Sequence, residues 1–268
     1  MNIALCFCVR NCGKYLPSIF ENIEMLKTLK FNIFCIFVYD NCSDNSEKLL
    51  LEYQTNSNNV IVKNITNNSK HRTVRISKAR NVCLDIIYNE LKNISFHMMI
   101  DSDDSCSSKW NIDIINKYLN NFDDDDWDSI SFNKKDYYDI WALLYDDFKH
   151  HCFGYDDKEW NVVRAMQKDI SKKLNECKSN SIEVLSGFNG FAIYKTEKFK
   201  DFYYDGLYEN FKNLVSDDEV NNSIQALKDK FNLDVKLRQN PCCCEHLFYH
   251  ISASKKGLKI KISKLIVI

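Results

Sequence analysis

Two aspartates stand directly behind an apolar run near residue 100. Phe96–Ile100 predicts a buried strand, and Asp101 and Asp103 follow it at once. Carboxylates at positions i and i+2 of a strand end are able to share one hard divalent cation, Mg²⁺ or Mn²⁺, which in turn neutralises a pyrophosphate. A solvated turn that caps the next helix, with Asp104 or Ser105 as the cap, would use the same residue types. The local pattern leaves both interpretations open.

Two further polar pairs follow apolar runs in the same way. Arg10 and Asn11 come after the first run, and Asp40 and Asn41 come after the second. In sheets of parallel strands, ligands bind outside the carboxyl ends of the strands. We therefore expect these pairs and the two aspartates to meet at one rim of a sheet and to form the active site there.

The elements that must position these residues alternate along the first hundred residues. Buried strands separated by amphipathic helices predict an α/β fold with a mostly parallel central sheet flanked by helices. Beyond residue 105 the order is less regular, and a smaller mixed or antiparallel part is expected. We expect one domain, 1–268. The predicted strands cover 3–9, 33–39, 60–65 and 96–100, a strand–turn–strand unit at 182–194, and an edge-like final strand at 258–268. The predicted helices cover 19–29, 48–53, 76–91, 110–119, 158–177 and 219–231.

Composition narrows the class of protein. The chain has 268 residues, and 36 Lys and Arg against 37 Asp and Glu give a net charge of −1. That balance argues against a nucleic-acid binder held by a bulk positive field. No run of about 18 apolar residues occurs, so no membrane span is expected. The 12 cysteines lack zinc-type spacing and a disulfide framework, which predicts reduced thiols and a cytoplasmic protein, in the host cytoplasm if the gene is viral.

A series of motifs in chain order resembles the nucleotide-sugar glycosyltransferases of the GT-A fold. Together the motifs span nearly the whole chain. They resemble the branch of these enzymes that carries a D-x-D motif and a C-terminal C-E-H box. The motifs are Cys8-Val9-Arg10-Asn11 with Tyr15-Leu16, Asp40-Asn41-x-Ser43-x-Asn45, Arg75 with Arg80-Asn81, Asp101-x-Asp103, the glycine-bearing segment Ser186–Lys195, and Cys244-Glu245-His246 with His250.

The resemblance implies a UDP-sugar or a related nucleotide-sugar donor and a Mn²⁺ or Mg²⁺ cofactor. Residues 1–104 would bind the donor, and residues 105–268 would bind the acceptor and carry the metal and acid box. Asp101 would bind the ribose, or the metal through water, and Asp103 would ligate the metal directly. Asp40 would accept a hydrogen bond from the uracil or ribose, and Arg75 or Arg80 would pair with the pyrophosphate or orient the carboxylates. The full set implied for the donor is Arg10, Asn11, Asp40, Asn41, Arg75, Arg80, Asp101, Asn189 and Gly190.

Two histidines are candidates for a further metal ligand beside Asp103. His246, inside the C-terminal box, is preferred over His250 as the ligand that completes the shell of Asp103. The other histidine is expected to be buried and bonded to the backbone.

The general base needed for an inverting transfer is also left open. Glu245 and the pair Asp217 and Asp218 are the candidates. Ser216-Asp217-Asp218-Glu219 is equally what a helix N-terminus favours, for capping and for the helix dipole.

The expected activity is metal-dependent transfer of a hexose from a nucleoside diphosphate sugar to a hydroxyl of a glycan or protein acceptor. A nucleotidyltransferase and a non-catalytic nucleotide-sugar-binding module are the alternatives, and a homodimer is left open. Trp141, Trp160 and Phe188 are aromatic side chains able to stack on a sugar face.

Overall fold

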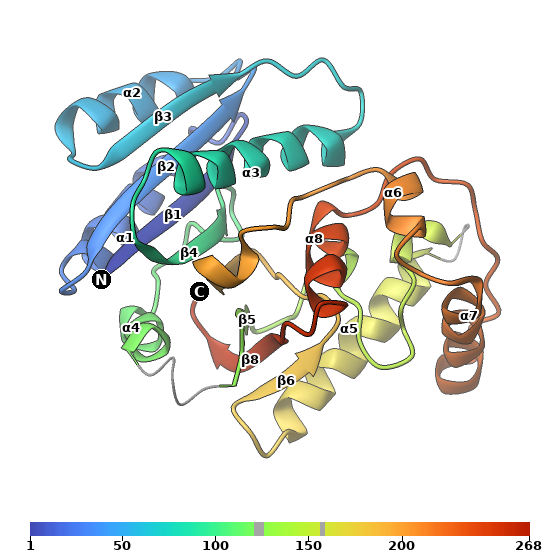
Figure 1. The fold of residues 1–268 in the computed structure, drawn as a ribbon. Coiled ribbons are helices and arrows are strands. Elements are labelled where there is room, and N and C mark those ends of the chain that lie inside the picture. The colour runs from blue at the N-terminus through green and yellow to red at the C-terminus, as the bar shows by residue number, and fades with distance from the viewer. Residues whose placement is uncertain (121–125, 156–158) are drawn as a thin grey trace. The chain divides into compact units, whose positions relative to one another are not determined.

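The computed structural model describes residues 1–120, 126–155 and 159–268 (Figure 1). The chain forms two compact units. Unit 1 comprises Met1–Asp126, Gly190–Asp201 and Ile266–Ile268, and unit 2 comprises Trp127–Asn189 and Phe202–Leu265. The single domain 1–268 expected from the sequence and its division at residue 104 both stay predictions.

Unit 1 contains a sheet in the order β3-β2-β1-β4-β7. β1, β2, β3 and β4 are parallel neighbours, and β7 is antiparallel to β4. The strands are β1 (Asn2–Val9), β2 (Asn32–Asp40), β3 (Val60–Ile65), β4 (Ile94–Asp101) and β7 (Phe191–Lys195). The helices are α1 (Leu16–Lys27), α2 (Ser46–Asn56), α3 (Arg72–Asn89) and α4 (Ile112–Asn120), with a 3₁₀ turn at Thr196–Phe199.

The strand order of unit 1 reverses at β1. The chain moves outward from β1 to β2 and β3, then returns through α3 to the other side of β1, where β4 lies. Because parallel crossovers are right-handed, the outward helices α1 and α2 cover one face and the returning α3 covers the other. α3 packs on β1 and β2, whereas α2 packs on β3 and touches α1. The point of reversal lies at the carboxyl ends of β1 and β4.

Unit 2 contains a smaller sheet in the order β5-β8-β6, formed by β5 (Ser129–Asn133), β8 (Ile260–Ile266) and β6 (Ser181–Val184). β6 and β8 are antiparallel. The helices of unit 2 are α5 (Glu159–Glu176), α6 (Tyr208–Lys212), α7 (Asp217–Phe231) and α8 (Glu245–Ser254), with 3₁₀ turns at Ile140–Ala142 and Cys152–Gly154. The predicted α/β class, with a mostly parallel sheet flanked by helices and a smaller antiparallel part, is confirmed.

Two local predictions are wrong. The final strand is not an edge strand, because β8 has neighbours on both sides. Along this strand Ile260 and Ile262 are buried, whereas Lys261 and Lys264 are half-buried. The helix predicted from residue 76 begins at Arg72, because the single apolar residue of its first turn, Val74, is too little for apolar periodicity to detect.

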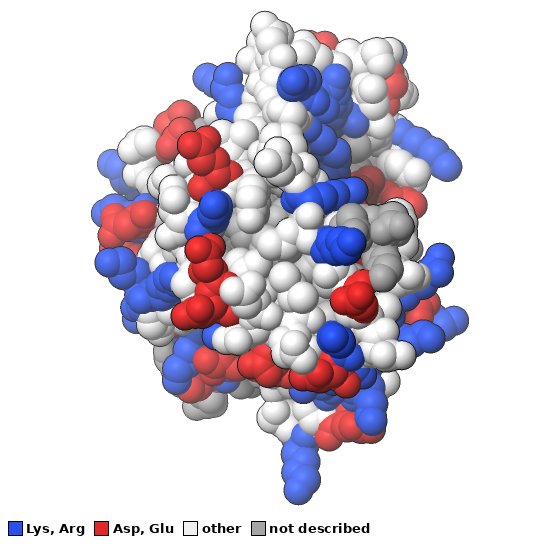
Figure 2. All heavy atoms as spheres, turned by 90° about the vertical axis from the view of Figure 1, so that its right-hand side faces the viewer, with Lys and Arg blue, Asp and Glu red and all other residues white. Residues whose placement is uncertain are grey.

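The distribution of charged side chains at the surface reflects the composition of the chain. Positive and negative side chains are interspersed over the face drawn in Figure 2, as the near-zero net charge suggests. Among the helices that the structure describes, none combines the length and the apolar character needed to cross a bilayer.

One polar side chain lies in the centre of the unit 1 sheet. His97 of β4 is fully buried, stacks on Tyr194 of β7 at 4.8 Å between ring centroids, and lies with Nδ1 3.3 Å from Oγ1 of Thr196. Burial lowers the pKa of His97 to about 3, so the ring is neutral in the fold. The unfolded chain binds a proton there below pH 6.5, so the contribution of His97 to stability is present above that pH and is lost as pH falls towards 3.

We therefore expect acid to destabilise the fold partly through His97. Between pH 7.5 and pH 5.0 the free energy of unfolding should fall by about 2 kcal/mol on account of this residue. Urea denaturation at the two pH values measures this loss of unfolding free energy. His97→Phe keeps a ring against Tyr194 and should lose less unfolding free energy over the same pH interval. Equal losses in the two proteins would show that His97 does not titrate as described.

Candidate functional site

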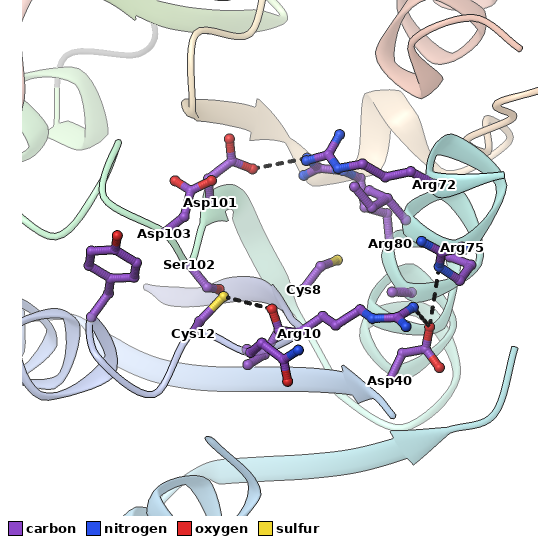
Figure 3. A pocket seen from close by; sticks show the side chains of 15 residues that line it. Cys8, Arg10, Cys12, Asp40, Arg72, Arg75, Arg80, Asp101, Ser102 and Asp103 are labelled. Atoms are coloured by element: carbon purple, nitrogen blue, oxygen red, sulfur yellow. Dashed lines mark hydrogen bonds and ion pairs between the residues drawn. The ribbon is translucent and has the colours of Figure 1, made fainter. Parts of the chain in front are cut away.

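A pocket of about 370 Å³ lies in unit 1 at the carboxyl ends of β1, β2 and β4. This volume is within the range of small-molecule sites. In Figure 3 the carboxylates of Asp101 and Asp103 lie on one side of the pocket, and the helix α3 with its arginines lies on the other. The lining residues are Cys8, Val9, Arg10, Asn11, Cys12, Tyr15, Asp40, Arg72, Arg75, Ile76, Ala79, Arg80, Asp101, Ser102 and Asp103.

One face of α3 forms a wall of this pocket. The five lining residues of the helix, Arg72, Arg75, Ile76, Ala79 and Arg80, follow the spacing i, i+3, i+4, i+7, i+8. That spacing places side chains on one side of an α-helix. Three arginines of a single helix are therefore presented to the same cavity.

Asp40, at the end of β2, holds two of the pocket's arginines. Its Oδ2 lies 3.3 Å from Nη1 of Arg10 and 3.9 Å from Nε of Arg75, and its Oδ1 accepts a hydrogen bond from the backbone N–H of Asn67 at 3.3 Å. Asp40 is only 5% exposed. Its carboxylate thus orients two guanidinium groups, and its predicted role at a uracil or ribose stays a prediction.

Asp101, at the end of β4, is paired with the buried Arg80. Nη2 of Arg80 lies 3.1 Å from Oδ1 of Asp101, and the Arg80 side chain is 4% exposed. On the backbone side, the N–H of Asp101 donates to the carbonyl of Gly190 at 2.9 Å. Gly190 has φ of +88°, a conformation that favours glycine. Gly190 therefore fixes the backbone of Asp101 rather than lining the cavity.

Asp103 combines the two roles that the sequence left open. Its Oδ1 accepts hydrogen bonds from the backbone N–H of Ser105 at 3.0 Å and from Ser105 Oγ at 2.6 Å, which closes a turn. The same carboxylate lines the pocket. The turn thus holds Asp103 in place with one oxygen, and the second oxygen can serve a ligand.

The pocket fits a divalent cation that arrives with phosphate. Among the residues that the structure describes, no three His, Cys, Asp or Glu side chains are grouped so as to hold a metal. Mg²⁺, however, is usually held by one or two carboxylates together with substrate phosphates and water. Asp101 and Asp103 meet that requirement without a preformed cage of protein ligands among the described residues of unit 1.

The charge of the pocket favours an anion. Four arginines against three aspartates leave one net positive charge among the lining residues. Cys12 adds no negative charge, because burial raises the pKa of its thiol to about 11. A bound divalent cation would increase the positive excess, which matches a diphosphate.

Arg72 is the functional candidate that the sequence reasoning missed. It is exposed at the first turn of α3 and lines the pocket, and the ion pairs among the described residues do not include it. Its spacing of three residues from Arg75 was the available signal, once the helix is known to begin at Arg72.

The two asparagines at the strand ends shape loops. Asn11 has φ of +55°, and its Oδ1 accepts hydrogen bonds from the backbone N–H of Ser43 at 2.7 Å and from Ser43 Oγ at 3.3 Å. Asn41 has φ of +45° and is not among the lining residues. Asn tolerates this left-handed conformation better than most residues. Donor contacts by either asparagine stay predictions.

The other predicted site residues belong to unit 2. Asn189 is 1% exposed, accepts hydrogen bonds at Oδ1 from the backbone N–H groups of Tyr138 and Asp139, and donates from Nδ2 to the carbonyl of Phe132 at 2.9 Å. These bonds tie Asn189 to its own unit. None of these hydrogen bonds bears on the predicted contact of Asn189 with the nucleotide-sugar donor, which stays a prediction.

Asp217 and Asp218 lie exposed in the first turn of α7. Ser216 and Glu219 form a capping box there, with the Glu219 N–H donating to Ser216 Oγ at 3.2 Å and the Ser216 N–H donating to Glu219 Oε2 at 2.9 Å. Capping alone accounts for this sequence. A catalytic role for Asp217 or Asp218 stays a prediction.

The C-terminal box opens helix α8. Cys244 is the N-cap, and Glu245, 4% exposed, lies in the first turn, where the helix dipole favours a carboxylate. Burial raises the pKa of the Cys244 thiol well above its ordinary value, and the nearby carboxylates of Glu245 and Asp139 raise it further. Asp139, which the sequence reasoning did not single out, is thus a second carboxylate near the box.

The two histidines of α8 have different surroundings. His246 is 1% exposed and stacks on Phe188 at 3.7 Å between ring centroids, with its Nε2 3.8 Å from Oε1 of Glu245. His250 lies with Nδ1 3.0 Å from Oγ of Ser186. His250 is therefore buried and lies within hydrogen-bond distance of the Ser186 side chain. A metal contact by His246 stays a prediction.

The two pocket carboxylates should differ in their effect on stability. Asp101→Asn leaves the buried Arg80 without its carboxylate and should cost about 2 kcal/mol of unfolding free energy. In Asp103→Asn the amide oxygen is still able to accept from Ser105, so the loss should stay within about 0.5 kcal/mol. Urea denaturation of both variants at pH 7.5 measures the difference. Equal losses would contradict the assignment of Asp101 as the partner of a buried guanidinium.

Comparison with known proteins gives limited guidance. No protein-family model matches the sequence. No curated protein matches it. Among solved structures, S. aureus TarS 1–349 in complex with UDP-GlcNAc is similar with a TM-score of 0.45 and 18% identity, over 76% of this chain and 49% of that one. The chain thus spans about half the length of that structure.

Two further solved structures are similar at the same level. The mannosyltransferase PcManGT from Pyrobaculum calidifontis, in complex with GDP-Man and Mn²⁺, has a TM-score of 0.43 and 10% identity, over 76% of this chain and 47% of that one. Glucosyl-3-phosphoglycerate synthase from Mycobacterium tuberculosis, in complex with Mn²⁺, UDP and phosphoglyceric acid, has a TM-score of 0.45 and 11% identity, over 90% and 72% of the two chains. Since TM-scores below 0.5 do not establish a common fold, the function has to be inferred from the residues of the pocket.

Proposed function

We propose that this protein is a metal-dependent glycosyltransferase of the GT-A type. It transfers a hexose from a nucleoside diphosphate sugar, in the first place a UDP-sugar, to a hydroxyl of a glycan or protein acceptor. The observation that carries the proposal is the pocket at the reversal point of the unit 1 sheet, where two strand-end carboxylates face an arginine-bearing helix. Doubly wound sheets bind nucleotides at this position.

The arginines account for the phosphate part of the donor. When the sugar leaves the nucleotide, negative charge grows on the diphosphate, and oriented guanidinium groups stabilise that charge. Arg10 and Arg75 are held by Asp40, and Arg80 is held by Asp101. Arg72, which has no such pairing among the described residues, is the arginine best able to bind a phosphate oxygen directly.

Asp101 and Asp103 are the residues that would hold Mn²⁺ or Mg²⁺. When bound, the cation supplies Lewis-acid stabilisation of the departing diphosphate. Oδ1 of Asp101 is paired with Arg80, and Oδ1 of Asp103 accepts from Ser105, so both carboxylates are held in fixed positions at the pocket.

An inverting transfer would also need a base that removes the proton of the acceptor hydroxyl. Glu245 is preferred over Asp217 and Asp218, because the helix dipole at the first turn of α7 already accounts for the latter pair. Glu245 is buried, and the carboxylates of Glu245 and Asp139 both lie near Cys244, whose pKa they raise. His246 remains the candidate for a further metal contact.

A nucleotidyltransferase is the second candidate, and the loop after β1 speaks against it. Such an enzyme would present free backbone N–H groups of a glycine-rich loop to the phosphates. Here the N–H of Gly13 donates to Oδ2 of Asp44 at 2.9 Å, and the N–H of Cys12 donates to Oγ of Ser46 at 2.8 Å. Those donors are already used.

The donor is tested by thermal shift with UDP-, GDP- and dTDP-sugars, with and without Mn²⁺. We expect a UDP-sugar to raise the melting temperature more with Mn²⁺ than without, and UDP release to accompany transfer. Asp103→Asn should keep a folded protein and lose turnover by at least about 100-fold. No shift with any nucleotide would refute the proposal. Binding without turnover in the wild type would favour the non-catalytic module.

The role of Arg72 is tested separately. Arg72→Met should weaken UDP binding about tenfold, because one charge-assisted hydrogen bond to phosphate is lost. Lys78→Met is the matched control, since Lys78 is an exposed cation of the same helix that bonds the carbonyl of Thr66 and does not line the pocket. Calorimetric titration with UDP measures both. Equal losses in the two variants would mean that α3 acts only through its general positive field.

A further inference from the structure

Unit 2 exposes an aromatic surface that the donor pocket does not use. Trp160, in the first turn of α5, is 59% exposed. Its ring meets the half-buried Trp141 edge to face at 5.6 Å between centroids, and Trp141 lies 6.0 Å from Phe153. We call these three residues the tryptophan platform. Because Trp160 joins Trp141 in one aromatic cluster and is not an isolated exposed side chain, the cluster is a candidate interaction surface.

A fixed pair of opposite charges borders the platform. Arg238 forms an ion pair with Glu159, and its Nε donates to the carbonyl of Phe153 at 2.8 Å. Nε1 of Trp141 donates to Oε1 of Glu159 at 3.5 Å. Glu159 and Arg238 therefore provide a carboxylate acceptor and a guanidinium donor at the edge of the aromatic rings, held in place by the platform itself.

The aromatic row continues inward to an unsatisfied polar group. His151 lies 6.4 Å from Phe153 between ring centroids and is 1% exposed. Neither of its ring nitrogens finds a hydrogen-bond partner within the part of the chain that the structure describes. Burying an imidazole in this way is costly, and native proteins keep such groups mainly where a ligand or a bound water completes them.

We propose that the tryptophan platform binds a pyranose ring of a neutral glycan, and that this is where the acceptor is held. A pyranose presents an apolar C–H face and a rim of hydroxyls that both donate and accept hydrogen bonds. An exposed indole face can pack against the C–H face, and the adjoining carboxylate and guanidinium can form hydrogen bonds with the hydroxyls. The acceptor part of this inference rests on the proposed function, but the binding of sugar to the platform does not.

The charge of the border selects this occupant over others. Glu159 and Arg238 neutralise each other, so the site offers no net attraction to a phosphate or an acidic peptide. A purely apolar partner would have to bury both charged groups without replacing their water, which is costly. A polyol satisfies both charges without breaking the ion pair, as recognition of small polar ligands generally requires.

The platform can be observed directly by fluorescence. Of the four tryptophans, Trp110 and Trp127 are 2% exposed, so Trp160 dominates the emission that acrylamide quenches. Cellobiose, maltose and N,N′-diacetylchitobiose serve as probes on the full chain. We expect at least one of them, at millimolar concentration, to shift the emission to the blue and to reduce acrylamide quenching at least twofold. If none does so, the inference is overturned.

Variants identify the site. Trp160→Ala should weaken the binding of that disaccharide at least tenfold, measured by saturation-transfer NMR so that loss of the fluorophore does not matter. Tyr203→Ala is the matched control, because Tyr203 is another exposed aromatic side chain of unit 2, at 54% exposure. This variant should bind the disaccharide as tightly as the wild type does. Equal weakening in both variants would overturn the inference.

Two further readouts separate this inference from its rivals and from the proposed function. Sedimentation of wild type and Trp160→Ala should give the same mass, and a lower mass for the variant would assign the platform to self-association instead. UDP binding should be unchanged in Trp160→Ala. Disaccharide binding in a protein that binds no UDP would refute the donor function and still support the platform as a sugar site.

Discussion

The structure of the candidate site depends on the neutralisation of buried charge at the strand ends. Arg80 is almost wholly buried and is paired with Asp101, and Asp40 is shared by Arg10 and Arg75. A buried guanidinium or carboxylate is tolerated only with a partner. The same pairs that make burial tolerable also fix the direction of each arginine, so the anion site is preorganised before any ligand binds.

The topology of unit 1 makes this network possible. Because strand order reverses at β1, the loops after β1 and β4 diverge to opposite faces and leave a crevice between them. Helix α3 returns across that crevice and contributes three arginines from one face. Unit 2, in contrast, gathers aromatic rings and the buried C-terminal box. The residues proposed to bind phosphate and those proposed to bind a sugar thus belong to different units.

Much of this was predictable from short-range patterns. The parallel strands and the polar residues behind them follow from apolar runs ending in Arg10, Asp40 and Asp101, because a buried strand must surface at its carboxyl end. Arg72 was missed, since the first turn of its helix contains a single apolar residue, Val74, which is too little to show helical periodicity. The pairing of Arg80 with Asp101 lies between residues 21 positions apart, and no local pattern encodes such a contact.

The sequence by itself determined the α/β class and the residues at the rim of the sheet, because burial periodicity and strand termini are local properties. Only the tertiary structure decided their roles. It engaged Asp40 with two arginines and placed Trp160 in water beside Trp141. These outcomes depend on which side chains meet across elements, and distance along the chain does not specify distance in space.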